Sequence, residues 1–193
     1  MGFVFTASLT PGVAAAPSAP ASQRPLTIVH AFDNNADGTD PYSDFTLAPD
    51  GNLYGATSTG GPTNNGALFR VVLGRAYRTI ASLPKAIGSN VVGRLTVGPD
   101  GQLYGGTCTT VLTVFKVSTG GIFECVAPLY RNFKDRVTFG TDGSLYGVTQ
   151  PVYGAGTVYR VARNGALSTI ATFKNQMAGN VPNPLTLGPD GNL

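Results

Sequence analysis

Short apolar runs rich in Val, Ile, Leu, Phe and Tyr alternate along this chain with turns that contain Gly, Pro, Asn and Asp. Such runs are typical of β-strands, because β-branched and aromatic side chains fit a pleated surface and turn residues end it. No long window has apolar positions spaced at i, i+3 and i+4, so we expect almost no helix. The pattern therefore predicts an all-β fold.

One motif, Leu-Thr-x-Gly-x-Asp-Gly-x-Leu-Tyr-Gly, recurs with small changes and organises these runs. Its Asp-Gly pairs begin at Asp50, Asp100, Asp142 and Asp190, at intervals of 50, 42 and 48 residues. Repeats of this length are the signature of solenoids, propellers and arrays. Because the motif occurs in every unit, we interpret it as a rule of construction and its aspartates as turn formers.

Each unit contains four β-like segments. Asp-Gly between the first two segments predicts a tight hairpin, because Gly supplies a positive φ at no steric cost. Four short antiparallel strands with apolar residues on both faces describe a propeller blade packed between two neighbours. The predicted strands are 45–48, 52–57, 67–71 and 77–83, then 95–98, 102–107, 112–117 and 123–129, then 137–140, 144–149, 157–161 and 167–173. Residues 26–32 resemble a fourth strand, and residues 185–188 a first strand.

The repeats predict a β-propeller domain over residues 26–193 that holds about three and a half blades. Propellers close with roughly 4–8 blades, and open sheet edges pair with other chains. We therefore expect this sequence to be a piece of a longer propeller. Two alternatives stay open: closure by self-association, or an open β array.

Residues 1–25 differ from the repeats. Residues 2–9 are apolar, residues 11–25 are rich in Ala, Pro and Ser, and Ala19-Pro20-Ala21 has the small-x-small pattern of a signal peptidase site. We interpret the segment as the remnant of a secretory signal, with a disordered Ala/Pro-rich linker as the alternative. No apolar stretch reaches the roughly 18 residues of a transmembrane helix.

Composition narrows the chemistry. Only 12% of the residues are charged, and the net charge of +3 comes from scattered Lys and Arg, so we expect no nucleic-acid partner. With one His and two Cys the chain cannot build a zinc site from these residues alone. A Ser-His-Asp triad would need His30, which aligns with alanines in the other units and is better read as a strand residue.

The units resemble bacterial extracellular tandem repeats of the GloVer type, found in choice-of-anchor surface proteins. The resemblance covers residues 26–193 and implies a secreted or cell-surface protein with propeller-like repeats. It brings no catalytic residues to this chain. The segments that match best are 28–32, 37–42, 50–57, 60–61 and 66–71.

The sharpest candidate site is a calcium loop. Oxygen-bearing side chains alternate through it, Gly supplies the turn, and an acid falls at the twelfth position, which is the ligand rhythm of a calcium-binding loop. A plain solvent-exposed turn uses the same residue types and remains the alternative. The proposed ligands are Asp33, Asn35, Asp37, Thr39 and Asp44.

Two further sets of residues are candidates for a structural or binding role. Cys108 and Cys125 would suit a disulfide in a secreted protein, but they are predicted on strands two and four, and non-adjacent strands are too far apart for a bridge. A bridge therefore requires that Cys108 lie in a loop that folds over, and this alternative stays open. Arg70, Lys116 and Arg160 occupy one position of strand three. They would either form a basic ring that binds acidic glycans or be solvated charges that discourage edge pairing.

From these observations we expect a non-catalytic, secreted or cell-surface scaffold that binds an unidentified protein or carbohydrate, with no cofactor other than calcium. The alternative is part of a propeller enzyme, a lyase or lactonase-like hydrolase with its active site at the central channel. Glu124 is the only glutamate, so paired-carboxylate chemistry would need aspartates from different blades to converge.

Overall fold

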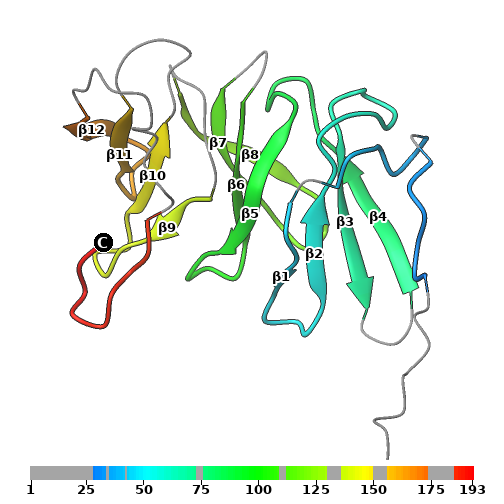
Figure 1. Cartoon of the computed structure of the whole chain (residues 1–193), viewed down its shortest axis with the longest axis horizontal. Coiled ribbons are helices and arrows are strands. Elements are labelled where there is room, and N and C mark those ends of the chain that lie inside the picture. Colours follow the sequence, from blue (N-terminus) through cyan, green and yellow to red (C-terminus); the bar gives the residue numbers. More distant parts are fainter. Residues whose placement is uncertain are drawn as a thin grey trace, which may run out of the picture.

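A computed structural model describes residues 28–33, 35–41, 43–72, 76–108, 112–129, 136–149, 156–173 and 185–193. Within these ranges it contains twelve strands and no helix. The strands form three antiparallel four-stranded sheets, each built from consecutive segments (Figure 1). The all-β class and the blades of four antiparallel strands are confirmed. The predicted signal remnant or linker, residues 1–25, lies outside the described residues.

Each blade adds its strands in chain order from one edge to the other. The first blade contains β1 (Thr46–Leu47), β2 (Leu53–Ala56), β3 (Ala67–Val72) and β4 (Ala76–Ser82). The second contains β5 (Val91–Val97), β6 (Leu103–Thr107), β7 (Thr113–Val117) and β8 (Phe123–Pro128). The third contains β9 (Thr138–Phe139), β10 (Leu145–Thr149), β11 (Thr157–Val161) and β12 (Leu167–Thr172).

The Asp-Gly turn that joins the first two strands of a blade is a three-residue loop. In the first blade the Ala48 amide donates to the Asn52 carbonyl at 2.9 Å, and the Gly51 amide donates to the Ala48 carbonyl at 3.0 Å. Gly51 has a φ of 77°, the left-handed conformation that glycine adopts freely. The same pair of backbone bonds closes the other three turns, so the motif forms one local structure four times.

The aspartate of the motif has a second role, because it anchors the tyrosine that follows. The Tyr54 hydroxyl donates to Asp50 Oδ2 at 2.8 Å, while Oδ1 of the same carboxylate accepts the Asn52 amide at 3.1 Å. The later blades repeat the tyrosine bond, at 2.8 Å from Tyr104 and at 3.0 Å from Tyr146. The turn and the second strand are thereby tied together, and the interpretation of these aspartates as turn formers fits the structure.

The glycine after each tyrosine makes room for an aromatic ring of the third strand. A Cβ on Gly55 would lie 2.5 Å from Phe69 Cζ, and one on Gly105 would lie 2.8 Å from Phe115 Cζ. The third blade has a tyrosine at the same place, Tyr159, whose ring covers Gly147 in the same way. A side chain on these glycines would therefore collide with the core.

Two apolar cores fill the seams between neighbouring blades. The first joins blades one and two, and its fully buried members include Tyr54, Leu68, Leu95 and Phe115. The second joins blades two and three. Because β7 places Phe115 in the first core and Val114 in the second, the middle blade packs between its two neighbours, as the sequence predicts.

The two flanking segments differ from the prediction. Residues 28–33 do not form a strand; the His30 ring instead stacks on Tyr77 of β4, with centroids 3.5 Å apart. Residues 185–188 are not a strand either, although the turn at Gly188 repeats. A strand requires a ladder of backbone hydrogen bonds to a neighbouring strand. Residues 28–33 are held instead by side-chain contacts of His30 with Asp37 and Tyr77.

The first blade exposes apolar residues where later blades bury theirs. Phe45 is 51% exposed, whereas Leu95 at the same position of the second motif is 1% exposed.

The described ranges contain no helix long and apolar enough to cross a membrane.

Candidate functional site

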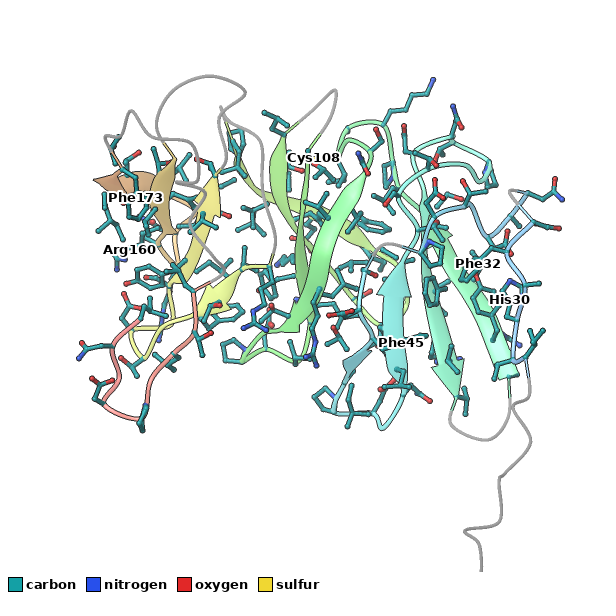
Figure 2. The ribbon with its side chains drawn as sticks, in the orientation of Figure 1. His30, Phe32, Phe45, Cys108, Arg160 and Phe173 are labelled. Carbon is teal, nitrogen blue, oxygen red and sulfur yellow. The ribbon has the colours of Figure 1, made fainter. Side chains whose placement is uncertain are left out.

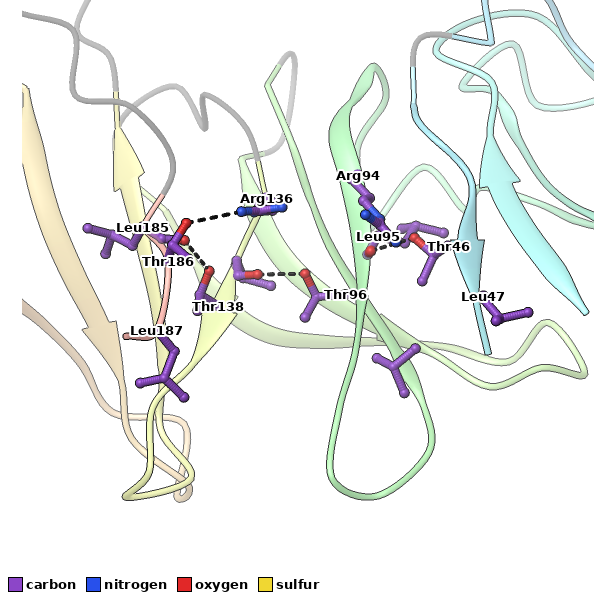
Figure 3. A pocket seen from close by; sticks show the side chains of 12 residues that line it. Thr46, Leu47, Arg94, Leu95, Thr96, Arg136, Thr138, Leu185, Thr186 and Leu187 are labelled. Carbon is purple, nitrogen blue, oxygen red and sulfur yellow. Dashed lines mark hydrogen bonds between the residues drawn. The ribbon is translucent and has the colours of Figure 1, made fainter. Parts of the chain in front are cut away.

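The innermost strands of the blades and residues 185–187 line an open cavity of about 330 Å³, which we call the central cavity (Figure 3). Its wall comes from the same part of the repeated motif in four successive units. The wall residues are 46–47, 94–97, 136–138 and 185–187. The cavity therefore lies at the position of a propeller's central channel.

One hydrogen bond, repeated three times, holds the wall together. The motif threonine of each inner strand donates its hydroxyl proton to a backbone carbonyl of the next inner strand (Figure 3). The donor–acceptor distances are 2.6 Å from Thr46 to Leu95, 2.6 Å from Thr96 to Val137, and 2.7 Å from Thr138 to Leu185. These bonds keep neighbouring inner strands in register, so equivalent residues lie at matching levels.

The charged groups of the wall are two arginines. Arg94 is exposed and Arg136 is half-buried, and each comes immediately before the residue whose carbonyl accepts the threonine bond. The guanidinium of Arg136 donates to the Thr186 hydroxyl at 3.3 Å. Within the described ranges neither arginine has a carboxylate partner, and the lining contains no carboxylate, imidazole or thiol. The described part of the wall thus presents positive charge.

An apolar level lies further along the same strands. Leu47 and Leu187 are displaced from the threonines and arginines toward the hairpin turns, as Figure 3 shows. Both are substantially exposed, at 57% and 38%, although they are large apolar side chains. A ligand in the central cavity would meet charged donors at one level and aliphatic carbon at another.

A second cavity, of about 320 Å³, opens at the seam between blades two and three. Its polar wall includes Asp100 and Tyr104, which bond to each other within one motif. The Arg163 side chain, which also lines it, donates to the Asp142 carbonyl at 3.0 Å. Since these polar groups already serve the motif turns, we regard this cavity as part of the blade seam.

The predicted calcium ligands lie outside the central cavity, and hydrogen bonds hold part of the set. The buried Asp37 carboxylate lies 2.6 Å from His30 Nε2 and accepts the Asp33 amide at 3.3 Å. The Asp33 carboxylate accepts the backbone amide of Asn35 at 2.9 Å and its side-chain amide at 2.8 Å. These bonds from Asn35 lower the pKa of Asp33. Calcium would have to displace some of these partners.

The rest of the predicted loop does not join this cluster in the described residues. Thr39 pairs its hydroxyl with that of Thr59 at 3.0 Å, and Asp44 is exposed. No group of three His, Cys, Asp or Glu side chains suited to a metal occurs in the described ranges. The calcium site stays a prediction.

The three basic residues of strand three do not form a ring. Lys116 pairs with Glu124 at 3.1 Å, and Arg160 pairs with Asp142 at 2.8 Å, each inside its own blade. Arg70 lies opposite Tyr54 in the ladder of the first blade. Figure 2 shows Arg160 at the far end of the molecule from His30. Each of these basic residues therefore makes its contacts within its own blade.

His30 and the cysteines have no place in the cavity wall. His30 lies beside β4, edge-on to Phe32 and stacked on Tyr77 (Figure 2). Cys108 follows β6 and Cys125 lies in β8, with β7 between them, and both are free thiols. Burial raises the pKa of the Cys108 thiol, which makes it a poor nucleophile at neutral pH.

Sequence reasoning missed Arg94 and Arg136. The only signal was their shared position, one residue before the Leu-Thr or Val-Thr pair of the motif. The first unit has Asp44 there, so the position differs between units and does not look like part of the repeat. Only the packing of the blades brings Arg94 and Arg136 to the wall of one cavity.

Comparison with known protein families matches residues 18–193 to the Gloeobacter/Verrucomicrobia repeat. The chain belongs to this repeat family. The match covers all three blades and the fourth turn, in agreement with the repeat that the sequence predicts. No curated protein matches the chain.

Solved structures similar to this family member include a gluconolactonase from Xanthomonas campestris, at 18% identity and a TM-score of 0.47, covering 65% of this chain and 45% of that one. A protein of unknown function from Dyadobacter fermentans has 14% identity and a TM-score of 0.46, covering 67% of this chain and 49% of that one. The chain thus spans less than half the length of these structures.

Proposed function

We propose that this chain is a non-catalytic binding module made of propeller blades, which holds its ligand in the central cavity. The observation that supports it most is the composition of the cavity wall. Arginine, threonine and aliphatic side chains from four units line it, and no carboxylate, imidazole or thiol is among the described lining residues. Such a wall can bind and orient a ligand but supplies no group for general acid–base catalysis.

The proposed setting is the cell surface or the surrounding medium, with a carbohydrate or protein as partner. The small-x-small pattern ahead of the repeats and the resemblance to surface repeats support this setting. Protease accessibility on intact cells tests it: the chain should be digested without lysis, and full protection would place it inside the cell.

Binding to glycan and peptide arrays tests the proposed function, with the full chain as the probe. Leu187→Trp fills the apolar level of the cavity and should abolish binding of the array ligand. Ile122→Trp is the matched control, because Ile122 is 70% exposed and lies at a turn before β8, away from the cavity. Binding that survives Leu187→Trp would show that the central cavity is not the site.

A further inference from the structure

The hydrogen-bonding groups of the central cavity are unevenly divided between donors and acceptors. Three lining hydroxyls already donate a hydrogen bond to a backbone carbonyl of the next unit, so they cannot donate one to a ligand. These hydroxyls belong to Thr46, Thr96 and Thr138. Donors remain on the guanidinium groups of Arg94 and Arg136. The cavity can therefore donate charge-assisted hydrogen bonds, and its described lining residues include no carboxylate that would accept them.

Thr186 extends this donor set. Its hydroxyl oxygen accepts a bond from Arg136 at 3.3 Å, which turns the hydroxyl proton away from the arginine. Within the described ranges that proton has no acceptor. Arg136, just before β9, and Thr186, in the segment that follows the third blade, can thus bind two oxygens of one ligand group.

Two cations of the sheets are paired with carboxylates inside their own blades, whereas Arg94 and Arg136, like Arg78 of β4, have no such pair in the described residues. Lys116 and Arg160 each have a carboxylate within 3.1 Å, supplied by their own blades. Arg94 and Arg136 have no such carboxylate in the part of the chain that the structure describes. A guanidinium in a concave wall attracts oxyanions strongly, because it can form two parallel bonds to a carboxylate or phosphate.

We propose that the central cavity binds a small organic oxyanion, a carboxylate or phosphate joined to a short aliphatic portion. The oxyanion contacts Arg94, Arg136 and Thr186, and the aliphatic portion lies along Leu187, which belongs to the same segment as Thr186. A volume of about 330 Å³ suits a ligand of this size and is near the lower limit of ligand pockets. The proposal rests on the proposed function, because it names the ligand class of the same site.

Four probes of equal chain length test the ligand class by isothermal titration calorimetry on the full chain: hexanoate, hexyl phosphate, hexanol and hexylamine. We expect both anions to bind, and hexanol and hexylamine to bind at least about tenfold more weakly, since charged hydrogen bonds are lost. The ratio of the affinities for hexanoate and hexyl phosphate decides between the carboxylate and the phosphate source.

Matched variants locate the binding. Arg94→Gln and Arg136→Gln should each weaken hexanoate binding by about tenfold or more. Arg78→Gln, on the exposed outer strand β4, should leave the affinity unchanged. Because Arg94 is exposed and Arg136 bonds only at its tip among the described residues, the variants should keep the thermal midpoint of the wild type.

Three results would overturn the proposal. Equal affinities for hexanol and hexanoate would remove the role of charge, and an equal loss in all three arginine variants would make the effect non-specific. The third is failure of both anions to bind while Leu187→Trp still abolishes binding of an array ligand. That result refutes the oxyanion and leaves the proposed function standing, whereas an array ligand that Leu187→Trp does not affect refutes the proposed function itself.

Discussion

Replacing Tyr159 by Phe should stabilise the fold, which is unusual for a change in a core. Tyr159 is 2% exposed, and its hydroxyl has no hydrogen-bond partner in the described part of the chain. Burial strongly raises the pKa of this hydroxyl, as expected for a phenol without a polar partner. The equivalent residues of the other blades, Phe69 and Phe115, fill the same place without a hydroxyl.

The size of the effect follows from the cost of an unpaired polar group. A buried hydroxyl without a partner costs about 1–3 kcal/mol, and Tyr159→Phe removes that cost while keeping the ring. Each kcal/mol shifts the thermal midpoint of a chain of this length by about 2–4 °C. We therefore expect the midpoint of Tyr159→Phe to rise by at least about 2 °C.

Calorimetry of the wild type and two reciprocal variants measures this prediction. Phe115→Tyr adds a hydroxyl at Cζ, the atom that would lie 2.8 Å from a Cβ on Gly105, and should lower the midpoint by a similar amount. A loss of more than about 1 kcal/mol in Tyr159→Phe would show that the hydroxyl has a partner, and would refute the reasoning.

Three further predictions concern the seams and the motif. Thr96→Val keeps the shape of the side chain but removes the 2.6 Å inter-blade bond, so urea titration should show a loss of about 1–2 kcal/mol. Gly105→Ala should cost about 1–3 kcal/mol in the same assay through overpacking, whereas Gly120→Ala, whose Cβ would meet only Ser118 Oγ at an ordinary contact distance of 3.7 Å, should be near neutral. Burial raises the pKa of Tyr104 and Tyr159, so the native state keeps protons that the unfolded chain releases near pH 10. Stability should therefore fall between about pH 10 and 12, and less steeply in Tyr159→Phe.

The blades could be predicted because each depends on local residues. The Asp-Gly turn needs a positive φ that only glycine adopts freely, and Gly51 has it. The sequence did not predict the bond from Tyr54 to Asp50, because a buried aromatic and a turn acid look like separate features until the hairpin folds. The inter-blade bond from Thr46 was also missed, since its acceptor lies 49 residues away.

The flanking segments and the site were harder to predict. Residues 28–33 match a strand pattern, but a pattern does not state whether a neighbouring strand is there to pair with them. The acidic loop that follows was predicted as a calcium site because its acids are close in sequence. The arginines at 94 and 136 lie in different units, and only the packing of the inner strands brings them to one cavity.

Chemical-shift mapping tests most directly whether the inner strands form a binding site. Titration of ¹⁵N-labelled full chain with hexanoate should move amide signals in residues 94–97, 136–138 and 185–187 together with the side-chain Nε signals of Arg94 and Arg136. The Nε signal of Arg78 and the amides of β4 and β12 should stay in place. Shifts that cluster on β4 or β12, with the inner strands unmoved, would contradict the account.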